Sequence, residues 1–534
     1  MRRGSITLYL CLVLSILLSL IFAGLMSARL AAGRVVLASG LEQGLYSLFA
    51  GYDRELFDSY GLLFLDGGFG NEDLQLGQLL QEVEEAAEYV ICPGEGPFRQ
   101  PDLLGMALEN GELTGYTLAT DNGGAAFRRQ VCEVMRAELG AAGVEALAEM
   151  LKERLGIVQE QEKQTAEIDE EGVQREYEAL LQEANGQRAE QKTEEQAKAE
   201  RMTEPSGGGD MPEKTVGLLQ YRIKERAHPS EEKVLSDTEQ STEGGQPAEA
   251  PENFENPIEV ISNIRKMGIL SLALPNAAQL SGFSADKQEM PSGRELQQGM
   301  GVLAAEESGT IDKILLQEYL IKFFPCYTSE SQGEGLRYQV EYAIGKKQDD
   351  IENLKSVLNR LLAVREASNM IYLMTSPARS AEADEMALLI SSVLLIPQAA
   401  PLVSLLLKLC WSFGESILDL RELLKGGKVP LLKDDSSWKL SLNALSGLME
   451  AESAGDESSG GLDYQWYLRI LLLMESQESV TSALMDLTEY NMRIQNGRKT
   501  FRLDSCVETA EVSLTAGIQN HSFSIVRSYG YDME

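Results

Sequence analysis

Apolar residues fill the start of the chain without interruption. Residues 6–26 contain no charged side chain, and Arg2 and Arg3 precede them. At ~1.5 Å rise per residue, a helix of that length spans ~30 Å, the thickness of the hydrocarbon core of a bilayer. A cleaved signal peptide usually has an apolar stretch of only ~7–15 residues followed by a small-x-small site, and residues 22–25 provide no such site. We therefore expect residues 1–27 to be a retained membrane anchor.

The charges beside this anchor set its expected orientation. Arg2, Arg3 and the amino terminus favour a cytoplasmic amino terminus, although Arg29 and Arg34 on the other flank nearly balance them. We expect a single-pass protein of the cell membrane, with the bulk of the chain extracytoplasmic.

Small side chains recur every four residues along the anchor, at Ser15, Ser19, Ala23, Ser27 and Ala31. Residues four apart share one face of a helix. A face of small residues allows another helix backbone to approach closely. The first four positions are therefore candidate residues for helix packing in the membrane, although Ser and Ala are common enough for such a run to arise by chance.

Apolar positions continue at helical spacing beyond the anchor. Between residues 28 and 60 there is no proline, and the apolar positions are Leu37, Leu41, Leu45, Leu48, Phe49 and Leu56. This spacing predicts one long helix that ends at the glycine-rich stretch 65–73. Shorter helices are expected near 72–90 and 124–155, which makes 28–156 a helical extracytoplasmic region.

A second folded region of α+β class is expected at 257–534. Residues 256–275 have the pattern of an amphipathic helix that stops at a proline. Residues 336–344 alternate apolar and polar side chains, which predicts a half-buried strand, and a helix is expected from about Asp349. Residues 508–516 and 521–531 alternate again around a short turn, which predicts a hairpin. The chain as a whole is therefore predicted to be mainly α-helical with a small antiparallel sheet.

Residues 387–407 are also free of charge, and two structures fit them. A membrane span needs ~20 apolar residues, a length that this run reaches. Pro397 and Pro401 divide the run, however, and proline interrupts helical hydrogen bonding. Two buried helices joined by a turn, the second ending near Gly426, are the favoured interpretation, and a second span is the alternative.

Net charge is −36, from 83 acidic and 47 basic residues. This balance argues against binding to nucleic acid, which needs a basic surface. Residues 157–256 alone hold 25 acidic and 11 basic residues. We expect an acidic disordered linker there, with a helix-prone first part at 157–200.

Residues that could support catalysis or hold a metal are scarce. The five cysteines beyond the anchor have no metal-type spacing and are expected to be buried free thiols, with a Cys326–Cys506 disulfide as the alternative. His228 and His521 are the only histidines, and neither belongs to a catalytic motif. The turn around Asp66 lacks the ligand pattern of a calcium loop. We expect no catalytic, cofactor-binding or metal-binding residue, no cofactor and no enzymatic activity.

Several stretches of the chain are similar to the sequences of a known protein family. These stretches are residues 4–34, 46–66, 256–275, 361–373, 426–442, 463–474, 485–493 and 501–507. They resemble an uncharacterised family of membrane-anchored proteins from Gram-positive bacteria that is associated with tight-adherence (Flp-type) pilus loci. The amino terminus resembles the minor pilin-like proteins of those systems. This resemblance implies processing after Gly4 and Glu as the fifth residue of the mature chain, a position at which this sequence has Tyr9.

Two functional hypotheses follow. The first is a non-enzymatic, membrane-anchored surface protein that is a structural or assembly component of a tight-adherence pilus-like system. Its partners would be the lipid bilayer and other pilus-locus membrane proteins, contacted through the anchor helix. The alternative is an extracytoplasmic ligand-binding sensor or enzyme carried by 257–534, which would show a deep polar pocket with converging Arg, Asp or Glu side chains.

Overall fold

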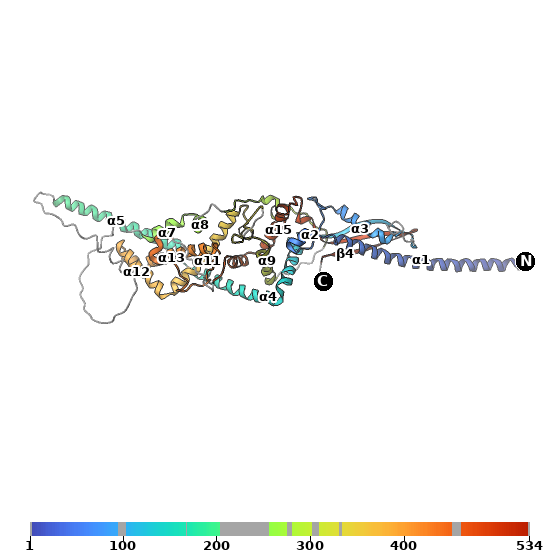
Figure 1. Cartoon of the computed structure of the whole chain (residues 1–534), viewed down its shortest axis with the longest axis horizontal. Coiled ribbons are helices and arrows are strands. Elements are labelled where there is room, and N and C mark those ends of the chain that lie inside the picture. Colours follow the sequence, from blue (N-terminus) through green and yellow to red (C-terminus); the bar gives the residue numbers. More distant parts are fainter. Residues whose placement is uncertain are drawn as a thin grey trace. The chain divides into compact units, whose positions relative to one another are not determined.

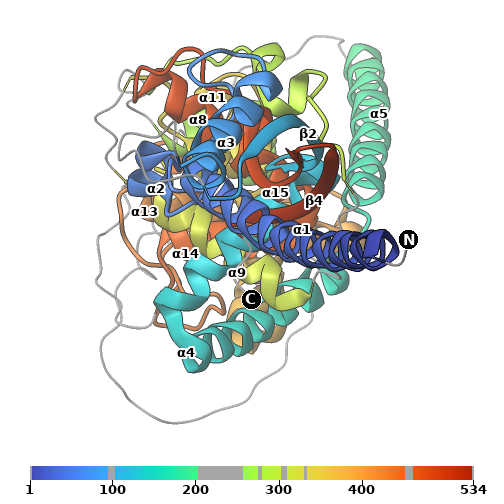
Figure 2. The same cartoon turned by 90° about the vertical axis from the view of Figure 1, so that its right-hand side faces the viewer.

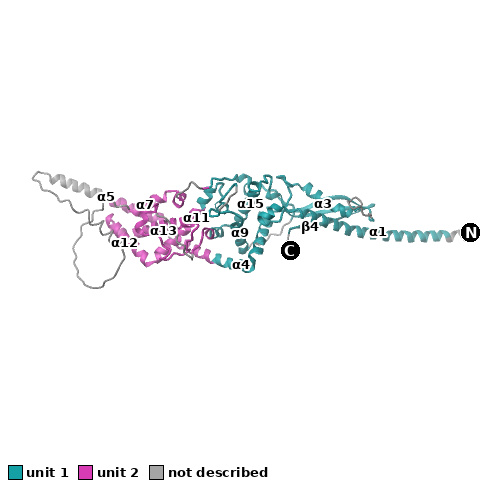
Figure 3. Cartoon of the chain, in the orientation of Figure 1, with its two compact units in different colours: residues 1–152, 281–356, 468–534 teal, residues 153–280, 357–467 magenta. Residues whose placement is uncertain are grey.

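The structure is a computed structural model that describes residues 3–93, 103–166, 168–202, 256–274, 280–301, 309–329, 334–450 and 461–531. It confirms the predicted class, a mainly helical chain with a small antiparallel sheet. The chain forms two compact units (Figure 3). Unit 1 comprises residues 1–152, 281–356 and 468–534, and unit 2 comprises residues 153–280 and 357–467. The linear segments expected from the sequence do not coincide with these units, because both units combine stretches that are distant in the chain.

Unit 1 is built on a long helix and a four-stranded sheet (Figure 1). The helices are α1 (Arg3–Phe49), α2 (Arg54–Tyr60) and α3 (Leu76–Ile91). The strands are β1 (Leu65–Asp66), β2 (Met106–Leu118), β3 (Cys506–Ile518) and β4 (His521–Gly530). All pairings are antiparallel, and β3 lies between β2 on one side and β4 with the short β1 on the other. The predicted hairpin is thus confirmed as β3–β4, and two strands from the amino-terminal region complete its sheet.

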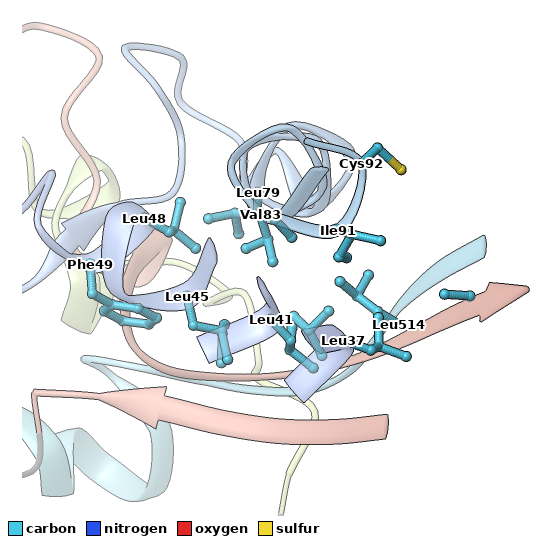
Figure 4. Packing of buried hydrophobic residues seen from close by; sticks show 14 of the residues in the cluster. Leu37, Leu41, Leu45, Leu48, Phe49, Leu79, Val83, Ile91, Cys92 and Leu514 are labelled. Atoms are coloured by element: carbon cyan, nitrogen blue, oxygen red, sulfur yellow. The ribbon is translucent and has the colours of Figure 1, made fainter. Parts of the chain in front are cut away.

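The core of unit 1 lies between the second half of α1, α3 and one face of the sheet. Every apolar position predicted between residues 28 and 60 is at most 5% exposed. From α1, Leu37, Leu41 and Leu45 point toward Val83 and Ile91 of α3, and Leu514 of β3 lies beside them (Figure 4). In Figure 2, β4 lies beside α1. The expected single helix over 28–60 is interrupted, however, because α1 ends at Phe49 and α2 starts afresh with Asp53 as its N-cap.

Further helices complete unit 1. They are α9 (Thr310–Phe323), α10 (Gln339–Gly345), α15 (Gln477–Ile494) and the short 3₁₀ turns η2 (Lys287–Glu289), η3 (Pro291–Gly293) and η6 (Leu503–Ser505). Three helices contribute residues to both units: α4 (Asp121–Thr165), α11 (Asp350–Thr375) and α14 (Tyr464–Met474).

The strand predicted at 336–344 is wrong, because this segment forms the helix α10. Within α10 the polar positions are as buried as the apolar ones, since Gln339 and Glu341 are both 0% exposed, whereas Arg337, just before the helix, is exposed. The amide groups of Arg337 and Tyr338 donate to the carboxylate of Asp350 at 2.9 and 3.1 Å. Those amides are therefore not available to a sheet, and the chain turns into a helix.

Unit 2 is helical within the described residues. Besides its shares of α4, α11 and α14, it holds α5 (Glu170–Met202), α7 (Pro257–Arg265), α8 (Ile269–Ala273), α12 (Pro377–Val393), η4 (Pro397–Ala399), α13 (Ala400–Leu424) and η5 (Leu442–Gly447). The amphipathic helix expected at 256–275 is divided into α7 and α8 around Gly268. The predicted linker is helical at 157–165 and 170–202, and its remainder at 203–255 lies outside the described residues, as does His228.

The charge-free run 387–407 forms the end of α12, a turn with η4 and the start of α13, as the favoured interpretation predicted. Two described helices are long and apolar enough to cross a membrane, Thr7–Phe49 and Pro397–Leu424. The apolar window of the second is 78% buried inside the protein, whereas that of the first is 0% buried. The second is therefore a core helix by its packing.

Candidate functional site

The amino-terminal half of α1 is a continuous apolar surface that the described residues leave uncovered. Leu8, Tyr9 and Phe22 are 70%, 69% and 67% exposed, and this half projects beyond the sheet (Figure 1). Soluble surfaces rarely carry continuous apolar patches of this kind, and a membrane is one environment that covers them. The chain thus has an exposed apolar helix with the properties of a membrane anchor or a signal sequence.

The four residues of the predicted packing stripe all lie on this exposed half. The hydroxyl groups of Ser15 and Ser19 donate to the carbonyl oxygens of Leu12 and Ile16 at 2.8 and 2.9 Å. Both hydroxyls are therefore satisfied within the helix, which suits an apolar environment. Ala23 and Ser27 are also exposed, and Gly4 lies in the first turn of α1. Helix packing through this stripe and processing after Gly4 remain predictions.

The stripe shares a face of α1 with the buried core of unit 1. Each stripe residue precedes a buried residue by 18 positions, or five turns at ~3.6 residues per turn. The pairs are Ser15 with Gly33, Ser19 with Leu37, Ala23 with Leu41 and Ser27 with Leu45. One continuous face of α1 is therefore covered by the sheet and α3 in its second half and uncovered in its first half.

Three glycines allow the second half of α1 to approach its neighbours closely. A Cβ atom at Gly44 would lie 2.6 Å from the carbonyl oxygen of Val83 on α3, and one at Gly40 would lie 2.8 Å from Cγ1 of Ile91. A Cβ atom at Gly33 would lie 2.7 Å from Cδ1 of Ile518 on β3. Sequence reasoning missed this seam, although its signal was the recurrence of glycine at helical spacing between the buried leucines.

Arg498 joins the elements that follow α1. Its guanidinium bonds the carboxylate of Asp53, which caps α2, and the carboxylate of Asp66 at 2.8 Å. Asp66 also accepts the amide of Gly68 at 3.0 Å, so its turn is held by a salt bridge and a local hydrogen bond. Nearby, burial raises the pKa of Cys506 well above its usual value.

The structure shows the state of the cysteines and of His521. No disulfide joins the six cysteines, all of which lie in the described residues, and the five beyond the anchor are buried. The alternative Cys326–Cys506 disulfide is therefore wrong. His521 is exposed at the start of β4. No group of three or more His, Cys, Asp or Glu side chains with metal-site geometry occurs within the described ranges.

A fully buried ionic cluster lies in unit 2. Arg365 bonds Asp419 at 2.9 Å, and Lys433 bonds Asp419 at 2.7 Å and Glu415 at 2.6 Å, with all four side chains at most 1% exposed. Burial disfavours the Asp419 carboxylate, yet the two cations hold its pKa below the usual value. The two positive and two negative charges compensate one another, and their ion pairs hold the loop carrying Lys433 against α11 and α13. Its sequence signal was two acidic residues inside the apolar helix α13.

Unit 2 also contains a cavity of about 430 Å³ among α5, α7 and α13. Glu170, Arg175 and Arg265 are among its lining residues. Arg265 already bonds Glu170 at 3.1 Å and Glu366 at 2.5 Å, so its charge is compensated within the protein. Burial raises the pKa of Glu366 to about 7, against the opposing effect of Arg265. Charged side chains thus lie close together at this cavity, but they pair largely with one another.

Comparison with known proteins identifies a family for the second half of the chain. Residues 247–518, just over half of the sequence, match the model of a family of unknown function (DUF5702). The matched segment ends with β3 and excludes α1 and β4. No curated protein and no solved structure matches the chain. The chain therefore belongs to this family of unknown function, DUF5702.

Proposed function

We propose that this chain is a non-enzymatic, membrane-anchored surface protein and a structural or assembly component of a tight-adherence pilus-like system. The observation that carries the proposal is the division of α1 into an exposed apolar half and a half buried under the sheet. A helix with this division holds a folded unit at the membrane surface without a flexible connection. The resemblance of the sequence to proteins of pilus loci supplies the biological context.

The anchor acts as an assembly surface as well as a tether in this proposal. Its small-residue face continues the face that the sheet and α3 cover in the second half of α1. Lipid tails pack against small side chains no better than against leucine, so such a face favours contact with another transmembrane helix. The partners are other pilus-locus membrane proteins, and the folded units lie outside the cell.

The test is co-purification of the full chain with pilus-locus membrane proteins after mild detergent extraction. Ser19→Leu and Ala23→Leu place large side chains on the small-residue face, and we expect both to weaken co-purification. Ala28→Leu is the matched control, because Ala28 is also exposed but lies ~140° around the helix from Ala23. Unchanged co-purification of all three variants contradicts the assembly role. The intact mass of the mature chain reports separately whether cleavage follows Gly4, follows Ala23 or does not occur.

A second candidate function is ligand binding in the cavity of unit 2, because charged side chains converge there. A ligand-observed NMR screen of small organic acids and amines against the full chain in detergent tests it. Binding that is lost in Arg265→Gln supports this candidate. Binding that persists in that variant places the ligand elsewhere.

A further inference from the structure

The two edges of the sheet in unit 1 are built differently. The outer edge of β2 is irregular, because its pairing with β3 shifts register at three places, near Leu108, Leu113 and Thr117. It carries Glu112, and Met300 covers part of this edge by a backbone bridge to Tyr116. Bulges, charges and covering segments are the devices by which proteins prevent an edge strand from pairing with another chain.

The opposite edge, formed by β4, is free of bulges, and among the described residues no segment is bridged to its outer side. Its ten residues pair with β3 in unbroken register from His521 to Gly530. Its single charged residue, Arg527, is engaged with Glu42 of α1 at 2.9 Å. Among the described residues, backbone hydrogen bonds reach β4 only from β3, so its outer amide and carbonyl groups face no partner strand. A long, regular edge with little charge is the kind that accepts a further strand.

Exposed apolar groups beside this edge extend the same surface. On the face of β4 toward α1, Tyr529 is 41% exposed, and Val35 and Tyr46 of α1 are 66% and 59% exposed. Val526, on the opposite face of β4, is 45% exposed. The rings of Tyr46 and Tyr529 are in contact, with centroids 5.9 Å apart. A strand added beside β4 would cover part of this apolar surface.

We propose that the free edge of β4 is a docking surface for a β-strand of a different protein at the same membrane surface. The inference rests on the proposed anchor function of α1, which fixes the direction of β4. Phe523 lies against Gly33 and Tyr529 against Tyr46, so β4 runs in the same direction as α1. All copies anchored in one membrane therefore present β4 in the same direction.

A second copy of the chain does not fit this edge. Antiparallel pairing of two β4 strands requires anchors that point in opposite directions. Parallel pairing of two copies would need a twofold axis along the membrane normal, which places identical residues of the two strands at the same height. In a parallel ladder, however, the residues whose backbone groups face the partner are staggered by one position between the two strands, so this symmetry does not allow the ladder to form. The anchored geometry therefore favours a strand from another chain.

The two faces of β4 define the chemistry of the partner strand. Phe523, Ile525 and Tyr529 lie on the face that packs toward α1. The other face of β4 carries Ser522, Ser524, Val526 and Ser528 at alternate positions, and all four are exposed. The partner is thus an amphipathic strand, with apolar residues toward α1 and small, mostly polar residues on the other side.

Site-specific photo-cross-linking of the full chain in its native membrane tests the proposal. The photoreactive residue p-benzoylphenylalanine is placed at Ser524 or at Ser528, with Glu112 on the protected β2 edge as the matched control. We expect adducts from both β4 positions that map to one segment of one other protein, at partner residues spaced as 524 and 528 are. Adding Val526→Lys, which places a charge on the edge, should remove most of the adduct.

Four outcomes overturn the proposal. Adducts between two copies of the chain show that the edge binds a second copy and not a different protein. Equal yields from β4 and Glu112 show that the edge has no special role, and contacts scattered over a partner are incompatible with strand pairing. Alkaline carbonate extraction distinguishes failure of the docking proposal from failure of the proposed anchor. A chain that is retained in the membrane but gives no β4 adducts refutes only the docking of a strand. A chain that is released from the membrane refutes the anchor and, with it, the argument against a second copy.

Discussion

Replacement of Gly44 by alanine tests the close packing between α1 and α3. The new methyl group would lie 2.6 Å from the carbonyl oxygen of Val83 and 3.1 Å from its Cγ1. A carbon atom needs more than 3 Å from a carbonyl oxygen, and a backbone group of α3 cannot rotate away as a side chain can. The two helices must therefore move apart, which loosens the leucine contacts of the core.

Two opposing effects set the magnitude. Alanine is favoured over glycine in a helix interior by about 1 kcal/mol. Overpacking of a well-packed core costs about 1–3 kcal/mol, and a clash with backbone lies at the upper end of that range. We expect Gly44→Ala to lower the local stability of unit 1 by about 1–2 kcal/mol, which is a factor of about 5–30 in the opening equilibrium. Gly77→Ala on α3 is the matched control, because a Cβ atom there meets nothing within 4 Å, and we expect no loss of stability.

Hydrogen exchange measured by mass spectrometry on the full chain in detergent provides the assay. Exchange of amides in α3 and β3 reports the opening of unit 1 independently of unit 2. Gly44→Ala should accelerate this exchange by the factor given above, while Gly77→Ala should leave it unchanged or slow it. Equal protection in wild type and Gly44→Ala would refute the glycine seam as the reason for the close approach.

Two further predictions concern unit 2. Lys433→Met leaves Arg365 as the one cation beside the two buried carboxylates of the cluster and removes the ion pair of Glu415, so we expect a loss of about 3–5 kcal/mol. Lys428→Met, at an exposed position of the same loop, should change stability by less than about 0.5 kcal/mol. Urea unfolding followed by exchange in α13 measures both, and equal effects would contradict a stabilising role of the cluster. Burial raises the pKa of Glu366 in the folded protein to about 7. The protonated carboxyl group therefore contributes its full stability below the ordinary pKa of glutamate, and this contribution is lost as pH rises through 7. Glu366→Gln should remove this part of the pH dependence of exchange in α7 and α11, and an unchanged profile would show that the carboxyl group does not titrate there.

The candidate site was predictable where its signal is local. The apolar run, the small-residue stripe and the leucine face of α1 follow from residue spacing, and each lies in the structure where that spacing places it. The glycine seam was not predicted, because a glycine reveals what it approaches only when the neighbouring helix is in place. The buried cluster around Asp419 was missed for the same reason, since its cations come from another helix and a loop.

The sequence alone determined the exposed apolar helix, the predominance of helices and the β3–β4 hairpin, because periodicity and turn residues act over short distances along the chain. The tertiary structure decided which strands join the hairpin, since pairing of β2 with β3 depends on segments about 400 residues apart. It also converted the alternating stretch 336–344 into a helix, because Asp350 engages the amides that precede it. Finally, it left the edge of β4 open, which no pattern within β4 reveals, because an edge exists only when the neighbours of a strand are known.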